Sequence, residues 1–264
     1  MQDTEDKRSA LSNALGRTDE LFDSFMNVLR QDFSGEKAEK RDFSETAARI
    51  IPDAPKEEIP PDAELIGAPD DERLHMSFDA LLEDSSKCTR CGLCETRHNV
   101  VFGTGCAERP VVMVIGEGPG ENEDLQGLPF VGRAGQYLDR WLDAISLSRN
   151  KDVYITNTVK CRPPQNRDPY PDEKKACFDF LRRQIELIRP QTILCLGKPA
   201  STLMTGQADA SMSSLRGRFF FYEGIPMICT YHPAAVLRDP DLRRPVWDDL
   251  KKLARYLGLP AGGV

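Results

Sequence analysis

Short runs of apolar residues, bounded by glycine, proline or polar residues, recur along the C-terminal part of the chain. The run at 111–115, VVMVI, is β-branched apart from Met113, and such a continuous run is typical of a strand buried on both faces. We interpret three later runs as strands too. The predicted strands are residues 111–115, 153–156, 192–196 and 226–230.

Segments with helical signals lie between and around these runs. Helices are predicted at residues 76–82, 132–145, 172–188 and 245–257. Strand and helix therefore alternate, which is typical of a parallel sheet covered by helices on both faces. The sequence predicts an α/β fold: a three-layer α/β/α sandwich with a central four-stranded, mostly parallel sheet.

Polar side chains stand directly after three of the four predicted strands. They are Glu117, Asn157 and His232. In open α/β sheets, ligands bind in the crevice outside the carboxyl ends of the strands. We therefore expect these three side chains to line one site.

The loop after the first strand, GEGPGENED at 116–124, is rich in glycine and acidic residues. It matches neither a Walker loop nor a GxGxxG turn, and its acidic residues would repel phosphate. A pocket that needs carboxylates, close backbone approach and one aromatic residue, Phe130, fits the segment better. Taken alone, the loop is equally consistent with an acidic surface turn.

The N-terminal part of the chain has a different character. Apolar residues at helical spacing predict an amphipathic helix over residues 8–33, within a helical extension at 1–50. Residues 51–75 are acidic and proline-rich, as in disordered linkers, and 76–260 form the predicted domain. The amphipathic helix either docks on the domain or on itself, or binds a protein partner.

Charge divides the chain at the same point. Residues 1–75 hold 19 acidic and 10 basic residues, a net charge of −9, whereas residues 76–264 hold 23 acidic and 25 basic residues, a net charge of +2. The overall acidity therefore does not argue against nucleic-acid binding by the domain. The sequence has no run of 18 apolar residues, and its charged start is unlike a secretory signal, so we expect no membrane span and a cytoplasmic protein.

Eight cysteines in a reducing compartment are more typical of metal ligands or core residues than of disulfides. Cys88, Cys91 and Cys94 form C-x2-C-x2-C, but His98 stands where a ferredoxin run needs its fourth cysteine. Cys161 and Cys177 form a second pair. Four thiolates in two pairs could hold zinc or an iron–sulfur cluster, and spacing does not choose between them.

Several motifs together resemble the family 4 uracil-DNA glycosylases. The resemblance covers residues 85–257 and rests on these segments: Cys88-x2-Cys91, GEGPGENED at 116–124, LPFVG at 128–132, YITN at 154–157, KCRPP at 160–164, Cys177, and HPAAVLR at 232–238. It implies a [4Fe–4S] cluster held by Cys88, Cys91, Cys161 and Cys177. Cys94 would then be a surplus thiol that could replace Cys91.

The resemblance also gives the predicted site a chemical purpose, because a base inside a duplex must be flipped out before it can be excised. Phe130 offers a face for stacking, Asn157 offers a donor and an acceptor for a Watson–Crick edge, and His232 can stabilise the departing uracil anion. Gly118 stands where the best-known uracil-DNA glycosylases have an aspartate. We therefore assign the water to Glu117 and the pocket floor to Glu123, which could instead be a solvated acid.

The HPAAVLR segment resembles the family's minor-groove loop. Val236 or Leu237 could wedge into the base stack, and Arg238 could contact a phosphate. A buried hydrophobic turn is the alternative interpretation of this segment.

The sequence therefore predicts a monofunctional uracil-DNA glycosylase of base-excision repair, acting as a monomer on uracil-containing DNA. One alternative is an iron–sulfur protein that binds uracil-DNA without catalysis, or that traps it covalently. Trapping relatives carry a histidine in the loop after the strand that ends at Asn157, whereas residues 165–171 read QNRDPYP. An iron–sulfur electron carrier is a third alternative, but it gives Asn157 and His232 no task.

Overall fold

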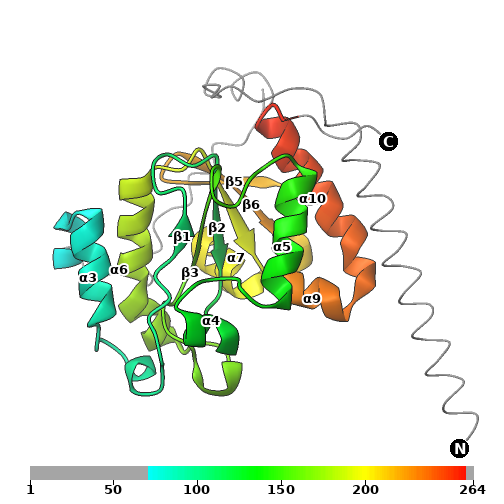
Figure 1. Cartoon of the computed structure of the whole chain (residues 1–264). Coiled ribbons are helices and arrows are strands. Elements are labelled where there is room, and N and C mark those ends of the chain that lie inside the picture. Colours follow the sequence, from blue (N-terminus) through cyan, green and yellow to red (C-terminus); the bar gives the residue numbers. More distant parts are fainter. Residues whose placement is uncertain (1–70, 260–264) are drawn as a thin grey trace, which may run out of the picture.

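The computed structural model describes residues 71–259, which form a six-stranded sheet with helices on both faces (Figure 1). The strand order is β1-β3-β2-β4-β6-β5, and the four inner strands run parallel. The strands are β1 Thr104–Gly105, β2 Val112–Gly116, β3 Val153–Asn157, β4 Thr192–Leu196, β5 Phe219–Tyr222 and β6 Ile225–Thr230.

The four predicted strands are confirmed as β2, β3, β4 and β6, but the predicted strand number of four is wrong. Two antiparallel strands extend the sheet, β1 beside β3 and β5 beside β6. β1 has only two residues and no apolar run, so it carries no strand signal of its own. β5 is apolar but pairs on one side only, in a hairpin that begins at an edge of the sheet.

The three-layer sandwich follows from the alternation of side chains along the inner strands. Val112 and Val114 of β2 pack with α5 and α10, whereas Met113 and Ile115 pack with α6 and α7. Figure 1 shows α6 on one side of the sheet and α5, α9 and α10 on the other. The helices are α3 Phe78–Ser86, α4 Glu121–Gln126, α5 Arg133–Ala144, α6 Pro171–Ile188, α7 Lys198–Thr205, α8 Met212–Leu215, α9 Pro233–Arg238 and α10 Arg243–Tyr256.

Short 3-10 turns complete the described elements: η1 Glu72–His75, η2 Gly92–Glu95, η3 Pro164–Asn166 and η4 Pro240–Leu242. The HPAAVLR segment, expected as a loop, forms the short helix α9 because His232 caps it and Pro233 suits its first position. The predicted amphipathic helix at 8–33 lies outside the described residues. Within residues 71–259, no helix has the length and apolar character needed to cross a membrane.

Residues on the N-terminal side of the predicted boundary at residue 76 contact the domain. The Arg73 side chain in η1 is only 4% exposed and forms ion pairs with Asp71 and Asp179, at 2.6 and 2.9 Å. It also donates to the carbonyl oxygen of Ala176, at 2.8 Å. Residues 71–75, which the sequence pattern assigned to the linker, are therefore packed against α6.

Candidate active site and cysteine pocket

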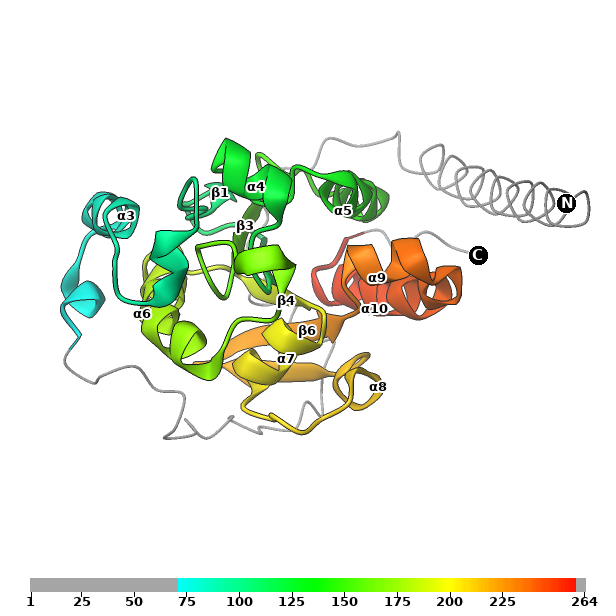
Figure 2. The same cartoon turned by 90° about the horizontal axis from the view of Figure 1, so that it is seen from below.

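A pocket opens at the carboxyl ends of the parallel strands, at the end of the molecule seen in Figure 2. The structure brings together there four side chains that the sequence placed far apart: Glu117, Phe130, Asn157 and His232. Gly116 at the end of β2 pairs in register with Asn157 at the end of β3, which aligns the two strand ends. We call this space the base pocket.

Asn157 lines the base pocket and is only 2% exposed. Its Oδ1 atom is buried without a hydrogen-bond partner. A Cβ atom on Gly116 would lie 2.4 Å from that oxygen and 2.8 Å from Cζ of Phe130. Glycine at 116 therefore keeps open the space beside the Asn157 amide and the Phe130 ring.

Phe130 is held in an unusual backbone conformation, with φ of 54°. Its carbonyl oxygen would lie 1.8 Å from a Cβ atom on Gly135, so only glycine allows α5 to start so close to it. The carboxylate of Glu123 accepts hydrogen bonds from the backbone N–H groups of Val131 and Gly132, at 3.2 and 3.4 Å. Glu123 thus fixes the loop that presents the Phe130 ring.

His232 faces Phe130 with 5.5 Å between the ring centroids. Its Nδ1 atom accepts a hydrogen bond from the backbone N–H of Ala234, at 3.1 Å. A neutral imidazole that accepts at Nδ1 must carry its proton on Nε2. Burial, and to a smaller extent Arg238, lower the pKa of His232 to about 4, so the ring is a neutral Nε2–H donor at neutral pH.

Glu117 is half-buried, and its Oε1 atom is buried without a hydrogen-bond partner. Burial and the nearby carboxylate of Asp168 raise the pKa of Glu117 to about 7. A Cβ atom on the neighbouring Gly118 would lie 2.8 Å from Val159, so glycine there allows the loop to lie against the segment after β3. Asp168 itself was not predicted, because one acid in a proline-rich loop has no distinguishing pattern.

The three residues expected to contact DNA have different environments on α9. Val236 is 1% exposed and belongs to the hydrophobic core, whereas Leu237 is 39% exposed. Arg238 lines the base pocket. Of the two candidates for a wedge, only Leu237 therefore lies at the surface.

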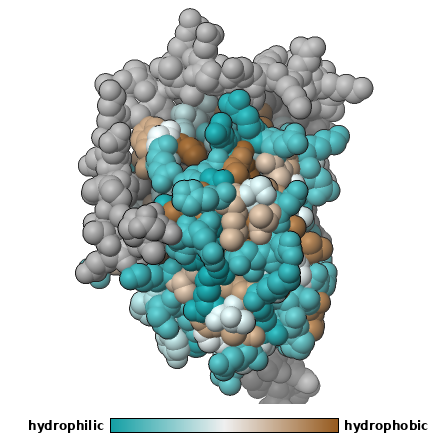
Figure 3. Space-filling model, turned by 90° about the vertical axis from the view of Figure 1, so that its left-hand side faces the viewer, coloured by the Kyte–Doolittle hydropathy of each residue, from teal (hydrophilic) through white to brown (hydrophobic). Residues whose placement is uncertain are grey.

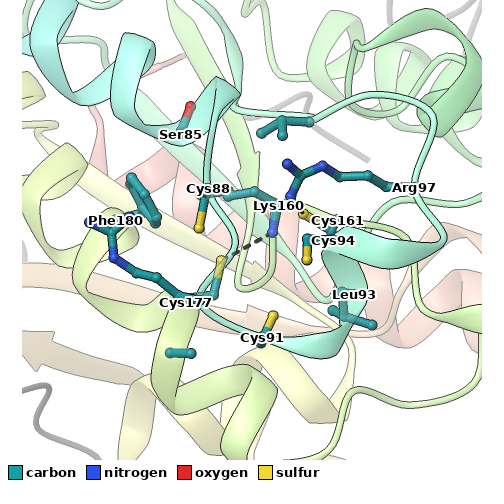
Figure 4. A pocket seen from close by; sticks show the side chains of 13 residues that line it. Ser85, Cys88, Cys91, Leu93, Cys94, Arg97, Lys160, Cys161, Cys177 and Phe180 are labelled. Carbon is teal, nitrogen blue, oxygen red and sulfur yellow. Dashed lines mark hydrogen bonds between the residues drawn. The ribbon is translucent and has the colours of Figure 1, made fainter.

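A second, apolar pocket lies beside the first and is lined by five cysteines: Cys88, Cys91, Cys94, Cys161 and Cys177 (Figure 4). Their sulfur atoms surround one space, into which Cys94 also points. Among residues 71–259, no three His, Cys, Asp or Glu side chains converge closely enough to hold a single metal ion as they stand.

The face that carries α3 and α6 is mostly hydrophilic, with scattered apolar areas (Figure 3).

Nitrogen donors reach two of these sulfur atoms. The Arg97 guanidinium donates to Sγ of Cys161 at 3.2 Å, and the backbone N–H of Lys160 donates to Sγ of Cys177 at 3.3 Å. Burial raises the pKa of the Cys177 thiol to about 12, so the cavity does not favour thiolates without a positive group inside it. Soft sulfur ligands with N–H donors in an apolar shell fit an iron–sulfur cluster.

Two other cysteines are buried among hydrophobic residues. Cys195 and Cys229 are fully buried and lie opposite each other in β4 and β6. Lys160 is a residue that the sequence interpretation missed. Burial lowers the pKa of its ammonium to about 7, whereas the Cys177 and Cys161 thiolates act in the opposite direction.

Comparison with known proteins identifies the family to which this chain is similar. A sequence model of the uracil DNA glycosylase superfamily matches residues 102–251. The chain is 42% identical over 189 residues to a type-4 uracil-DNA glycosylase of Archaeoglobus fulgidus, covering 69% of this chain and 94% of that protein. It is 44% identical over 178 residues to the type-4 enzyme of Thermotoga maritima, covering 66% and 92% of the two chains.

A type-5 uracil-DNA glycosylase of Pyrobaculum aerophilum is less similar. It is 30% identical over 138 residues, covering 47% of this chain and 61% of that protein. The longer and closer matches are therefore to the type-4 enzymes. This chain belongs to the uracil DNA glycosylase superfamily and, within it, to the type-4 uracil-DNA glycosylases.

Proposed function

We infer that this chain is a uracil-DNA glycosylase of DNA repair, which hydrolyses the bond between uracil and deoxyribose and leaves an abasic site. The observation that carries this conclusion is the buried Asn157 amide beside Phe130 and Gly116, whose Oδ1 atom has no hydrogen-bond partner. A flipped pyrimidine can stack on Phe130 while the amide binds its Watson–Crick edge. Uracil offers an acceptor at O4 and a donor at N3, which match the two halves of the amide.

His232 supplies the electrophilic assistance. As the glycosidic bond breaks, negative charge develops on the uracil carbonyl oxygens, and a fixed donor aimed at one of them stabilises the transition state. The Nε2–H of His232 is such a donor, because Ala234 occupies Nδ1. The ring stays neutral at physiological pH, so it donates this hydrogen bond without carrying a charge of its own.

Glu117 provides the carboxylate beside the sugar. The deoxyribose becomes cationic as uracil departs, and an anion near it can stabilise that charge or orient the attacking water. The unpartnered Oε1 atom of Glu117 is free to accept from a water. Glu123 acts on the pocket through the loop of Phe130. Gly118, where the best-known uracil-DNA glycosylases carry an aspartate, allows its loop to lie against Val159.

DNA is contacted through α9. The exposed Leu237 fits a wedge that fills the gap left by the flipped nucleotide, and Arg238 fits a phosphate contact at the rim of the pocket. On this proposal, Leu237→Ala slows excision from duplex DNA more than from single strands. The chain acts as a monomer, and the amphipathic N-terminal segment remains a candidate for binding a protein partner.

Cys88, Cys91, Cys161 and Cys177 hold a [4Fe–4S] cluster, with Cys94 as a fifth thiol in the same pocket. When bound, the cluster links the segment before β1 to the loop after β3 and takes no part in the hydrolysis. Anaerobically purified protein should contain about four iron and four sulfide ions per chain and absorb broadly at visible wavelengths. Stoichiometric zinc without iron would exclude the cluster.

Covalent trapping of the substrate finds no support in the loop that would have to perform it. Residues 164–171 line the base pocket with Asn166, Arg167, Asp168 and Pro169, and include no histidine. Arg167 is bound to Glu173 by two hydrogen bonds, at 2.7 and 2.8 Å. The loop therefore brings a carboxylate, not an imidazole nucleophile, to the pocket.

The function is tested with labelled oligonucleotides that contain one uracil or one cytosine at the same position. Excision of uracil should produce alkali-labile abasic sites, and the protein should turn over many times. A shifted, denaturation-resistant protein–DNA band would indicate trapping instead. Binding without strand cleavage after alkali would support the non-catalytic alternative.

A further inference from the structure

Lys160 lies between the two pockets and is one of the largest fully buried side chains among the described residues. It stands three residues after the base-reading Asn157 and directly before the cluster ligand Cys161. A buried lysine is unusual, because removing an ammonium from water is costly unless it is paired. Its position between the pockets raises the question of what its charge holds.

The Lys160 side chain folds back toward the base pocket and makes three hydrogen bonds. Its Nζ atom lies 2.6 Å from Oγ1 of Thr156, 2.6 Å from Oε1 of Gln184 and 2.8 Å from the backbone carbonyl oxygen of Asn157. Three acceptors match the three N–H groups of a charged ammonium, whereas a neutral amine has only two. The hydrogen bonds thus describe the charged form.

The two side-chain acceptors are themselves fixed by the segment before β2. The Thr156 hydroxyl donates to the carbonyl oxygen of Phe102 at 2.8 Å, so it offers a lone pair to Lys160. Gln184 donates through Nε2 to the same carbonyl at 2.9 Å, which orients its Oε1 toward the lysine. The network therefore holds the Asn157 carbonyl from a rigid frame.

None of these three partners is a carboxylate, so the buried positive charge needs an anion elsewhere. The backbone N–H of Lys160 already donates to Cys177, and Cys161 is its chain neighbour. An iron–sulfur cluster held by four thiolates carries a net negative charge. The cysteine pocket, which Lys160 also lines, is the natural place for that anion.

We propose that Lys160 is a positioning residue that holds Asn157 in its base-reading orientation, with the cysteine-bound cluster as the counter-ion of its ammonium. The inference rests on the proposed uracil-DNA glycosylase function and extends it. It gives a non-redox cluster an electrostatic purpose in substrate recognition. Lys160 fixes the backbone carbonyl of Asn157, and the side-chain amide of Asn157 is thereby held toward the base.

A double-mutant cycle tests this coupling through binding. The measured quantity is the preference for an oligonucleotide with 2′-fluoro-2′-deoxyuridine, which resists excision, over one with the matching cytidine. Lys160→Met should lower this preference about tenfold, within the range of coupling between residues in one hydrogen-bond network. In an Asn157→Ala background, the same change should lower it no further. If Lys160 were purely structural, Lys160→Met would lower the uracil preference equally in the wild-type and Asn157→Ala backgrounds. That result would overturn the proposal.

The cluster provides a second readout, and Arg97→Met provides the matched control. The Arg97 guanidinium donates to Cys161, and the Lys160 side chain lines the cysteine pocket. Removal of either positive charge should therefore shift the midpoint potential of the cluster to more negative values. Only Lys160 contacts Asn157, so the effect of Arg97→Met on uracil preference should be the same in both Asn157 backgrounds. An unchanged potential in Lys160→Met would refute the counter-ion role.

A second variant and two further outcomes keep the proposal distinguishable from the proposed function. If Lys160→Met does not fold, Thr156→Val removes one acceptor of the ammonium and should lower the uracil preference with the same dependence on Asn157. If wild-type protein excises uracil but the cycle is additive, the lysine proposal fails while the function stands. If wild-type protein neither binds nor excises uracil, the proposed function fails first.

Discussion

The base pocket and the cysteine pocket share one short segment, in which Asn157 lines the first pocket and Lys160 and Cys161 line the second. The polar groups of the two pockets nevertheless differ in whether they have hydrogen-bond partners. In the base pocket, the buried Oδ1 of Asn157 and Oε1 of Glu117 have no partner. In the cysteine pocket, the side chains of Arg97 and Lys160 have partners. A pocket that binds and releases a substrate leaves hydrogen-bonding groups without partners. In a pocket for a permanently bound group, the polar side chains already have hydrogen-bond partners in the protein.

This difference has an energetic side. Each buried polar atom without a partner costs about 1–3 kcal/mol in the free protein, and a correct ligand recovers that cost. A wrong base leaves it in place, so the unpaired atoms are the source of specificity.

The largest effect is expected at Asn157. Asn157→Asp should lower uracil excision about 10⁴-fold, because sites that bind a substrate through buried hydrogen bonds discriminate by that order. A protonated aspartate can accept from N4 of cytosine and donate to N3, so weak cytosine excision should appear. Single-turnover assays on both oligonucleotides measure the change. If Asn157 only ends its strand, the variant would retain a near wild-type rate.

His232→Ala should lower the excision rate by about 10²–10³-fold, as the loss of one oxyanion donor does in other enzymes. The pKa of about 4 keeps the His232 ring neutral from about pH 5 upward. The loss of rate should therefore be similar at every pH in that range. Binding to uracil-DNA should change little. Single-turnover rates and fluorescence anisotropy separate the two effects.

Two variants serve as controls for the histidine. His232→Ser can still cap α9, so a rate as low as that of His232→Ala would separate catalysis from helix capping. His98 is largely exposed and bound to Asp124 at 2.7 Å, outside the base pocket. His98→Ala should therefore excise uracil normally. A wild-type rate in His232→Ala would exclude the electrophilic role.

A smaller effect, visible mainly through pH, is expected at Glu117. Its pKa of about 7 means that the carboxyl is neutral in acid and becomes an anion as the pH rises through 7. The excision rate should therefore fall about tenfold for each pH unit below 7 and level off above it. The Glu117→Gln variant should excise uracil slowly, and its rate should no longer fall as the pH drops below 7. Glu123→Gln should keep it, because Glu123 acts through the Val131 and Gly132 backbone.

The parts that sequence alone could predict share one property: their signal is local. A buried strand is a run of apolar residues, and its end is the polar residue that follows, so β2, β3 and β6 and their terminal side chains could be located. The two-residue β1 has no such run. The burial of Val236 depends on how α9 docks against α5 and the core, which its own residues do not reveal.

The parts that could not be predicted depend on partners far along the chain. Lys160 looks like any lysine beside a cysteine until Gln184 of α6 and Phe102 are seen around it. Asp168 gains its influence on Glu117 only when the loop folds over the pocket. Arg73 stands in an acidic, proline-rich stretch, where a single basic residue is expected to be exposed to solvent. It is nevertheless bound to Asp179, more than 100 residues away.

The smallest effect on catalysis is expected at the start of the described structure. A chain that begins at Asp71 should excise uracil at the full-length rate, because every residue assigned to either pocket lies after it. A chain that begins at Met76 loses Arg73 and leaves the buried Asp179 carboxylate without this partner. Its free energy of unfolding should fall by about 3 kcal/mol, the cost of breaking a buried ion pair. Urea denaturation measures this, and Arg73→Met in the full chain should reproduce the loss. An inactive chain from Asp71 would instead make residues 1–70 part of the catalytic unit.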